Sequence, residues 1–206
     1  IYIALPNSHH YEWINKCIDH GKHILVEKPI TENFFQLEKI RNKLIQKNSN
    51  VLIYEGFMYK YHPQIKKVLN IVENNEIGEI TKIISSFGVN LLTKKNFWFF
   101  KKKKKIDREG RLFNKKLGGG SILDLGCYTV SFITMLLELL KFNNFEDYEV
   151  FDKRVEIGET GVDIDSKIDI KVGGKINVKL SSSFKENIGS ATEIYGSNGS
   201  IFIPNP

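Results

Sequence analysis

The sequence predicts an α/β protein: a parallel sheet with helices, followed by an α+β region with a large, open, mostly antiparallel sheet. Two observations support this fold class. Short, wholly apolar runs alternate with helical patterns over residues 1–57, as in parallel sheets that are covered on both faces. Apolar and polar residues then alternate with period two towards the C-terminus, which is typical of an antiparallel sheet with one buried face. We therefore expect two domains, 1–57 and 58–206.

The first region reads as strand, helix, strand, helix, strand. The expected strands are Ile1–Leu5, Ile24–Val26 and Val51–Tyr54. Ser8 is a plausible N-cap for the first helix, and Gly21 suits its end. The second helix should bury a stripe that contains Phe34, Leu37, Ile40 and Leu44.

The second region begins with a helix at Pro63, because proline suits the first helical position. Gly78 ends this helix, and a strand is expected over Glu79–Phe87. A long helix should follow from Ser121 to about Lys141. The period-two segments are Asp165–Val172, Lys175–Phe184, Ala191–Tyr195 and Ser200–Ile203.

The positive charge is concentrated in one segment. Of the total net charge of +6, residues 94–116 carry +9, from nine Lys and two Arg against two acids, so the rest carries −3. We treat 94–116 as a basic insertion and expect Lys101 to Lys105 to form a solvated, poorly ordered loop, since blocks of like charge repel. No nucleic-acid partner is expected, because nucleic-acid-binding domains spread their positive charge over a folded face.

The two cysteines, Cys17 and Cys127, have neither metal-ligand spacing nor a disulfide pattern. We expect a reducing, cytoplasmic setting and no metal site. The longest apolar run, near Met135 to Leu140, is too short to cross a bilayer, so no membrane partner is expected. Because Ile1 already opens a strand, we expect the chain to begin inside a fold.

Two sets of residues are candidates for chemistry. Ligands of open parallel sheets bind beyond the carboxyl ends of the strands, where Lys28 follows Val26. A lysine at this position is also compatible with an ordinary solvated strand end. Asp124 and Tyr128 are four residues apart and share a face of the expected helix. Each has a structural alternative: Ser121 and Asp124 have the spacing of a capping box, and Tyr128 could be a core tyrosine.

Four phrases occur in a recognisable order: Leu5-Pro6-Asn7-Ser8-His9-His10, Glu27-Lys28-Pro29, Glu55 to Pro63, and Gly118 to Tyr128. Together they resemble the glucose–fructose oxidoreductase, inositol dehydrogenase and rhizopine catabolism protein (Gfo/Idh/MocA) family, most closely its dihydrodiol dehydrogenase-like branch. The resemblance implies the C-terminal part of a Rossmann parallel sheet, followed by a substrate and oligomerisation domain whose C-terminus is incomplete here.

The resemblance also implies an NAD- or NADP-dependent oxidoreductase that acts on a CH–OH group of a sugar, polyol or dihydrodiol. It implies a small-molecule substrate and a homo-oligomer formed through the C-terminal sheet of the full-length protein. The implied catalytic residues are Lys28, Asp124 and Tyr128. The implied cofactor-binding residues are Pro6, Asn7, His10, Glu27 and Lys28, and we expect Lys60 and Arg111 to bind substrate.

The chemistry fits these residue types. A tyrosine with an ordinary pKa of about 10 is a poor base near neutral pH, and a nearby ammonium lowers that pKa. We therefore expect Lys28 to tune Tyr128, which exchanges the proton, while Asp124 positions Lys28 or the substrate. The glycine-rich phosphate-binding turn of the family does not occur in this sequence, so we expect this chain to bind cofactor weakly on its own. A non-catalytic cofactor or sugar sensor and an inactive truncated product remain alternatives.

Overall fold

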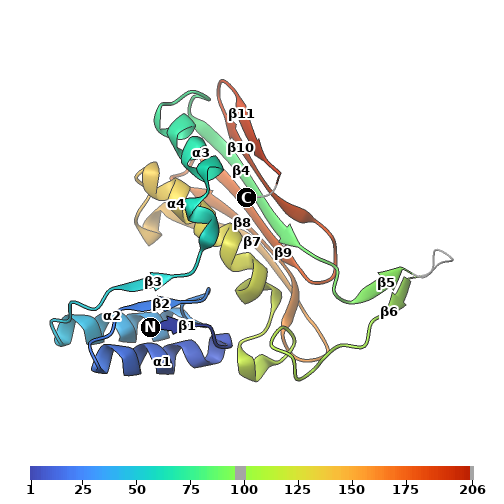
Figure 1. The fold of residues 1–206 in the computed structure, drawn as a ribbon. Helices are drawn as coiled ribbons and strands as arrows, with labels where there is room; N and C mark the ends of the chain where they lie inside the picture. The colour runs from blue at the N-terminus through green and yellow to red at the C-terminus, as the bar shows by residue number, and fades with distance from the viewer. Residues whose placement is uncertain (96–100, 205–206) are drawn as a thin grey trace.

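In the computed structural model, which describes residues 1–95 and 101–204, the chain forms two main sheets joined by a short connector, and a further two-stranded sheet (Figure 1). The smaller sheet is parallel and the larger one is mostly antiparallel, as the sequence predicts. A 3₁₀ turn, η1 (Met58–Tyr61), and helix α3 (Pro63–Glu73) lead from one to the other. Pro63 stands at the start of α3, as expected.

The parallel sheet has three strands in the order β1 (Tyr2–Ile3), β2 (Ile24–Val26) and β3 (Ile53–Glu55). Helices α1 (Asn7–Asp19) and α2 (Phe34–Gln46) both lie on one face of it (Figure 1). The prediction that helices cover both faces of the parallel sheet is therefore wrong for the described residues. Consecutive right-handed crossovers that advance in one direction place their helices on the same side. Tyr2, Leu25 and Tyr54 are paired in register and remain exposed.

Two local predictions in this region are wrong. Helix α1 begins at Asn7, and its N-cap is Pro6 rather than Ser8. Of the stripe expected on α2, Phe34 and Leu37 are exposed and only Ile40 is fully buried. A sheet of three short strands offers the helix only a narrow surface to pack on.

The larger sheet has six strands in the order β11-β10-β4-β9-β8-β7. Only the β4 and β9 pair is parallel. Its strands are β4 (Ile80–Gly88), β7 (Tyr148–Ile157), β8 (Asp163–Val172), β9 (Ile176–Ser183), β10 (Gly189–Gly196) and β11 (Ser200–Ile203). Periodicity missed β7, because this edge strand is exposed along nearly all of its length and carries no alternating pattern.

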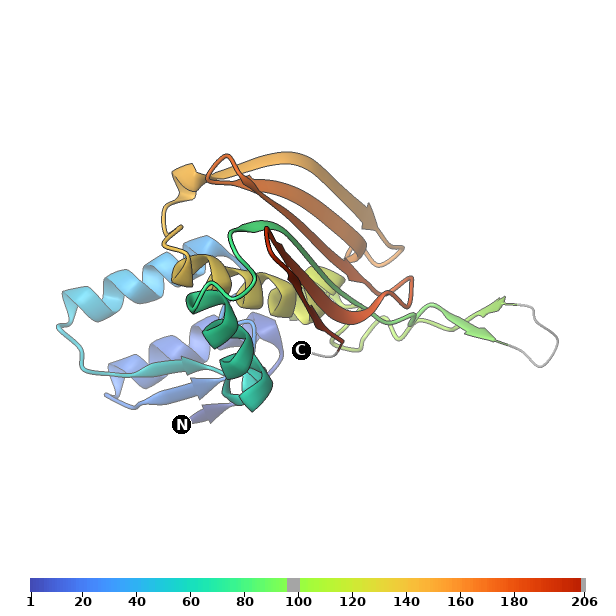
Figure 2. The same cartoon turned by 90° about the horizontal axis from the view of Figure 1, so that it is seen from above.

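Helices α3 and α4 (Cys127–Leu139) pack on one face of this sheet and form the main core (Figure 2). Ile83, Leu136 and Ile194 are completely buried there. The stretch Lys115–Leu139 is long and apolar enough to cross a membrane by length and composition. A buried core helix meets the same criteria, and α4 buries Phe132 and Leu137 against the sheet.

The basic segment differs from the expected loop. Strands β5 (Thr93–Lys95) and β6 (Lys101–Lys103) pair antiparallel and form a narrow arm that extends away from the sheets (Figure 2). Residues 96–100 of the basic insertion lie outside the described residues. After the arm, the chain returns to the body through a 3₁₀ turn, η2 (Lys115–Leu117). A further 3₁₀ turn, η4 (Phe145–Asp147), precedes β7.

The helix expected from Ser121 begins with a π-helical turn, η3 (Ile122–Gly126), which continues directly into α4. π-turns within helices are frequent at functional sites. This one carries Asp124, and Tyr128 follows in the first turn of α4. Both residues thus stand where the irregular turn meets the regular helix.

Candidate active site

Lys28 and Asp124 are 96 residues apart in sequence but form direct contacts. Lys28 follows β2, and its Nζ donates to the backbone oxygen of Asp124 at 2.6 Å and to Asp124 Oδ1 at 3.2 Å. Both side chains are only 14% exposed. Removing one partner of such a weakly solvated ion pair leaves the other charge uncompensated. This contact joins the carboxyl end of the parallel sheet to the start of the core helix.

Asp124 also holds a second cation. Arg111 Nη1 donates to the same Oδ1 at 2.8 Å, although the arginine side chain itself is 61% exposed. The capping-box interpretation of Asp124 is wrong, because Asp163 of β8 fills that role. Its Oδ2 accepts from the backbone nitrogen of Ile122 and from Ser121 Oγ, both at 2.7 Å. The carboxylate of Asp124 is thereby left to the two cations.

Two glycines allow the close approaches that this arrangement needs. A Cβ at Gly120 would lie 2.1 Å from Asp163 Oδ1, and the φ angle of 124° also favours glycine. A Cβ at Gly118 would lie 2.7 Å from the Cβ of Asn7. Asn7 Nδ2 donates to the carbonyl of Gly118 at 2.8 Å. The glycine turn therefore docks on the segment that follows β1.

Tyr128 lies in an aromatic cluster. Its ring centroid is 5.5 Å from that of Phe57 and 5.6 Å from that of Phe87, and Lys28 Nζ lies 4.8 Å from the Tyr128 ring centroid. The Tyr128 hydroxyl makes no hydrogen bond to any of the described residues. It is thus free to bond to a ligand, which a purely structural core tyrosine would not need.

The pKa of Tyr128 is raised above its ordinary value, mainly because burial disfavours the phenolate and further because Cys127 and Asp124 carry or develop negative charge nearby. The expected lowering by Lys28 does not occur in this arrangement. Lys28 lies over the face of the Tyr128 ring, and its ammonium is hydrogen-bonded to Asp124. Tyr128 therefore keeps its proton at neutral pH.

Two cavities adjoin these residues. A cavity of about 310 Å³ is lined by Ala4, Leu5, Pro6, Asn7, Glu27, Lys28, Arg111 and Leu117. A second, of about 230 Å³, is lined by Met58, Tyr59, Ser85, Ser86, Phe87, Tyr128, Thr129, Phe132, Ser190 and Thr192. We call them the lysine cavity and the tyrosine cavity. Five residues predicted from the sequence to bind cofactor or substrate therefore line the first: Pro6, Asn7, Glu27, Lys28 and Arg111.

Two predicted site residues lie elsewhere. His10 was expected to contact cofactor, but it is completely buried and both ring nitrogens bond to backbone carbonyls. Lys60 lines neither cavity, and its Nζ lies 5.1 Å from the ring centroid of Phe57. Direct ligand contact stays a prediction for both residues, and neither lines the two cavities described above.

Cys127 stands beside Tyr128 but is not a reactive thiol. Burial, as the largest effect, raises its pKa to about 12, so the thiolate is absent at neutral pH. Its Sγ donates instead to the carbonyl of Asp124 at 3.7 Å. Among the described residues, no group of three or more His, Cys, Asp or Glu side chains could hold a metal ion.

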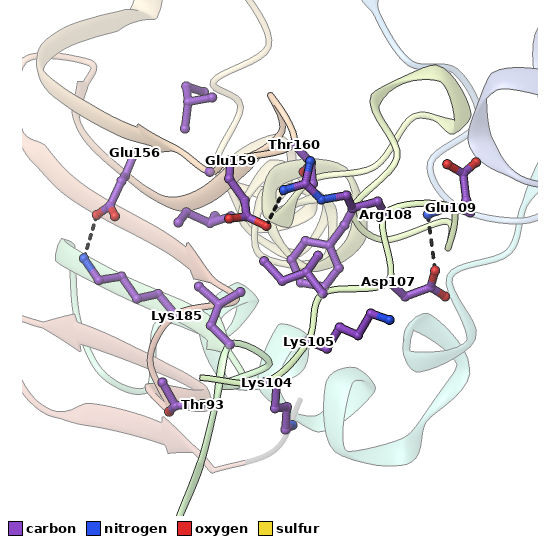
Figure 3. Close-up of a pocket in the computed structure, with 16 residues that line it drawn as sticks. Thr93, Lys104, Lys105, Asp107, Arg108, Glu109, Glu156, Glu159, Thr160 and Lys185 are labelled. Carbon is purple, nitrogen blue, oxygen red and sulfur yellow. Dashed lines mark hydrogen bonds and ion pairs between the residues drawn. The ribbon is translucent and has the colours of Figure 1, made fainter. Parts of the chain in front are cut away.

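A third cavity, of about 990 Å³, lies away from these residues, between the base of the arm and the β7–β8 turn (Figure 3). Four of its eight charged side chains form two ion pairs. Arg108 bonds to Glu159 at 2.9 Å and Lys185 to Glu156 at 2.7 Å. The side chains of Lys104 and Lys105 extend in different directions (Figure 3). Because these charges do not converge on one point, the cavity offers no evident subsite for a charged ligand.

A parallel sheet whose strand ends meet a glycine turn beside an open antiparallel sheet defines the class of two-sheet, Rossmann-type proteins. The chain belongs to the Gfo/Idh/MocA family. The model of the GFO/IDH/MocA C-terminal domain matches residues 65–202, and that of the oxidoreductase family with an NAD-binding Rossmann fold matches residues 1–55.

Individual relatives support the same assignment. The chain is 29% identical over 204 residues to the trans-1,2-dihydrobenzene-1,2-diol dehydrogenase of Xenopus laevis, covering 99% of this chain and 55% of that protein. It is 27% identical to a dTDP-3,4-didehydro-2,6-dideoxy-alpha-D-glucose 3-reductase of Saccharopolyspora spinosa, covering 98% of this chain and 54% of that protein. The chain thus spans about half the length of these curated relatives.

The fold also matches solved structures. A 3-ketoreductase from Actinomadura kijaniata, solved in complex with NADP and TDP-benzene, superposes with a TM-score of 0.79. The two are 23% identical, and the match covers all of this chain and 57% of the other. At this identity, the likeness establishes the fold alone.

Proposed function

We propose that this chain forms the catalytic part of an NAD(P)-dependent oxidoreductase that interconverts a CH–OH group and a carbonyl of a small molecule. The observation that carries the proposal is the meeting of Lys28, Asp124 and Tyr128 between two cavities. One cavity lies at the carboxyl end of the parallel sheet, where dinucleotides bind in such folds. The other lies against the open sheet.

The residues of the lysine cavity fit a nicotinamide ring. The cavity has room for a single ring with its carboxamide, and Asn7 and Lys28 offer polar groups at its wall. Pro6, Asn7, Glu27 and Lys28 would hold this part of the cofactor. When bound, the nicotinamide supplies or accepts the hydride.

Tyr128 is suited to donate the proton. Because burial raises the pKa of Tyr128, the phenol is protonated at neutral pH and can give its proton to a carbonyl oxygen as hydride reaches the carbon. A C=O bond thereby becomes CH–OH, and the phenolate recovers its proton from solvent. Lys28 offers positive charge beside the ring while the phenolate exists, and Asp124 holds Lys28 in place. In the reverse direction, when a CH–OH group is oxidised, Tyr128 accepts the alcohol proton.

The tyrosine cavity suggests the substrate class. None of its lining residues is charged, and aromatic rings and hydroxyl groups form its walls. About 230 Å³ holds one substituted six-membered ring, since a cavity of about 150 Å³ accommodates benzene. We infer a neutral, single-ring alcohol or ketone. The name of the Xenopus laevis relative, a dihydrodiol dehydrogenase, fits this inference better than do the nucleotide-linked sugars of the reductases.

Fluorescence titration with NADH and NADPH tests the proposal first, on the 206-residue chain and on any longer form that its gene encodes. Turnover is then measured with trans-1,2-dihydrobenzene-1,2-diol, with D-xylose and with a dTDP-linked keto sugar. We expect binding of one cofactor and turnover that is fastest with the neutral ring diol. Lys28→Met should abolish turnover, and the chain should stay folded because Arg111 still compensates the charge of Asp124. Binding without turnover of any compound would instead favour a cofactor sensor.

A further inference from the structure

The peptide between Pro29 and Ile30 is held on both sides by titratable side chains, His10, which is completely buried, and Glu55, which is partly buried. Its carbonyl, on Pro29, accepts from His10 Nδ1 at 2.8 Å. Its N–H, on Ile30, donates to Glu55 Oε1 at 2.8 Å. This peptide begins one residue after Lys28, whose ammonium is the centre of the proposed site.

The two side chains come from different elements. His10 lies on α1 and is completely buried, while Glu55 is the last residue of β3. Burial is the main reason that the pKa of Glu55 is raised, against the opposing effects of the Ile30 N–H and the charges of Lys60 and His10. Side chains from a helix and from a strand thus hydrogen-bond to the same peptide. Neither side chain lines the lysine or the tyrosine cavity.

His10 also contacts a second segment of the site. Its Nε2 bonds to the carbonyl of Leu5 at 2.9 Å, immediately before Pro6 and Asn7. Each of the two ring nitrogens thus lies within hydrogen-bonding distance of a different backbone carbonyl. One ring therefore ties the segment that carries Asn7 to the segment that carries Lys28.

We infer that His10 and Glu55 are positioning residues that fix the Pro29–Ile30 peptide and thereby aim Lys28 at the reacting atoms. The inference rests on the proposed function for the role of Lys28. The two hydrogen bonds that hold the peptide, from His10 and to Glu55, form what we call the clamp, and they can be observed without activity. A misplacement of about 1 Å at a reacting group costs on the order of 100-fold in rate, so a loosened clamp should lower turnover.

Two substitutions at His10 separate its two hydrogen bonds. The side-chain nitrogen of Asn corresponds in reach to ring Nδ1, and that of Gln corresponds to Nε2. His10→Asn should keep the bond to Pro29 and lose the bond to Leu5, and His10→Gln should do the reverse. We expect His10→Gln to lower kcat by about tenfold or more while cofactor Kd changes little. His10→Asn should weaken cofactor binding more than it lowers kcat.

This crossed pattern is the decisive result, because both variants replace a buried ring with a smaller amide and should lose similar stability. If kcat and cofactor Kd change in the same ratio in both variants, His10 is only a core residue and the inference is overturned.

Glu55 provides a second test should the His10 variants fail to fold. Glu55→Ala removes the acceptor of the Ile30 N–H, and Glu55→Gln keeps an acceptor in its place. Hydrogen–deuterium exchange at the Ile30 amide should be about tenfold faster in Glu55→Ala than in wild type, and normal in Glu55→Gln. Likewise, kcat should fall in Glu55→Ala and stay close to the wild-type value in Glu55→Gln. Equal exchange in both variants would overturn the clamp. A clamp seen by exchange in a protein without turnover would refute the proposed function only.

Discussion

Replacing Tyr128 with Phe tests the proposed chemistry most directly. The substitution removes one oxygen atom and keeps the ring that packs against Phe57 and Phe87. Since the lost hydroxyl has no hydrogen-bond partner among the described residues, the free energy of unfolding should change by no more than about 0.5 kcal/mol. The reaction, in contrast, loses its proton donor.

The expected loss of activity follows from the role of a general acid. Such a group contributes about 10²- to 10⁴-fold in rate, or about 2.7–5.5 kcal/mol of transition-state stabilisation. The NADH- or NADPH-dependent reduction of the best ketone should therefore slow by at least about 100-fold, with cofactor Kd unchanged. Stopped-flow absorbance at 340 nm and titration of cofactor fluorescence measure the two quantities.

Tyr148→Phe is the matched control. The Tyr148 hydroxyl donates to the carbonyl of Phe142 at 2.9 Å, and Tyr148 lines neither the lysine nor the tyrosine cavity. Losing that bond should cost about 1 kcal/mol, or about 2–4 °C in Tm, with unchanged kcat. Turnover within threefold of wild type in Tyr128→Phe, or a larger loss of Tm there than in Tyr148→Phe, would refute the reasoning.

Three further outcomes are expected. The rate of reduction should stay constant to about pH 10 and fall above it, because burial raises the pKa of Tyr128 and the protonated form persists below that pKa; a fall between pH 7 and 9 in the pH–rate profile would contradict this. Gly120→Ala should cost about 1–3 kcal/mol more than Gly189→Ala in urea unfolding. The new Cβ would meet Asp163, whereas at Gly189 it would meet open space. Cys127 should resist iodoacetamide at pH 8 until the protein is unfolded, as followed by mass spectrometry, since its pKa is about 12.

Local sequence patterns predicted the elements that bury one clear face. The short apolar strand at Ile24–Val26 and the proline at the start of α3 were both recognisable without any partner. Strand β7 was not, because an exposed edge strand has no apolar face to display. On α2, in contrast, the sequence predicted more buried residues than the structure has. Phe34 has the helical spacing of a core residue, but the sheet beneath the helix is too narrow to reach it.

The site residues that belong to sequence motifs could be predicted, whereas a residue that reaches the site only through the fold could not. Lys28 and Asp124 were placed together from their phrases, and they do meet. Asp163 was missed, because an acid at the start of a strand is common and only the folded chain brings it to Ile122. The direction in which the pKa of Tyr128 shifts was also predicted wrongly. Proximity to Lys28 was expected to lower it, and the burial that outweighs this effect is a property of the whole aromatic cluster.

The contacts between the two sheets explain why the site depends on so few residues. Asn7 bonds to Gly118, and Lys28 bonds to Asp124; in both cases a residue that follows a strand of the parallel sheet meets the turn that begins the core helix. The lysine cavity and the tyrosine cavity therefore share this seam, with Lys28 lining one and Tyr128 the other. A shift of the parallel sheet along the seam would move the proposed cofactor site and the proton donor relative to each other. Because hydride and proton must arrive at adjacent atoms of one substrate in the proposed reaction, the hydrogen bonds along the seam would set its geometry.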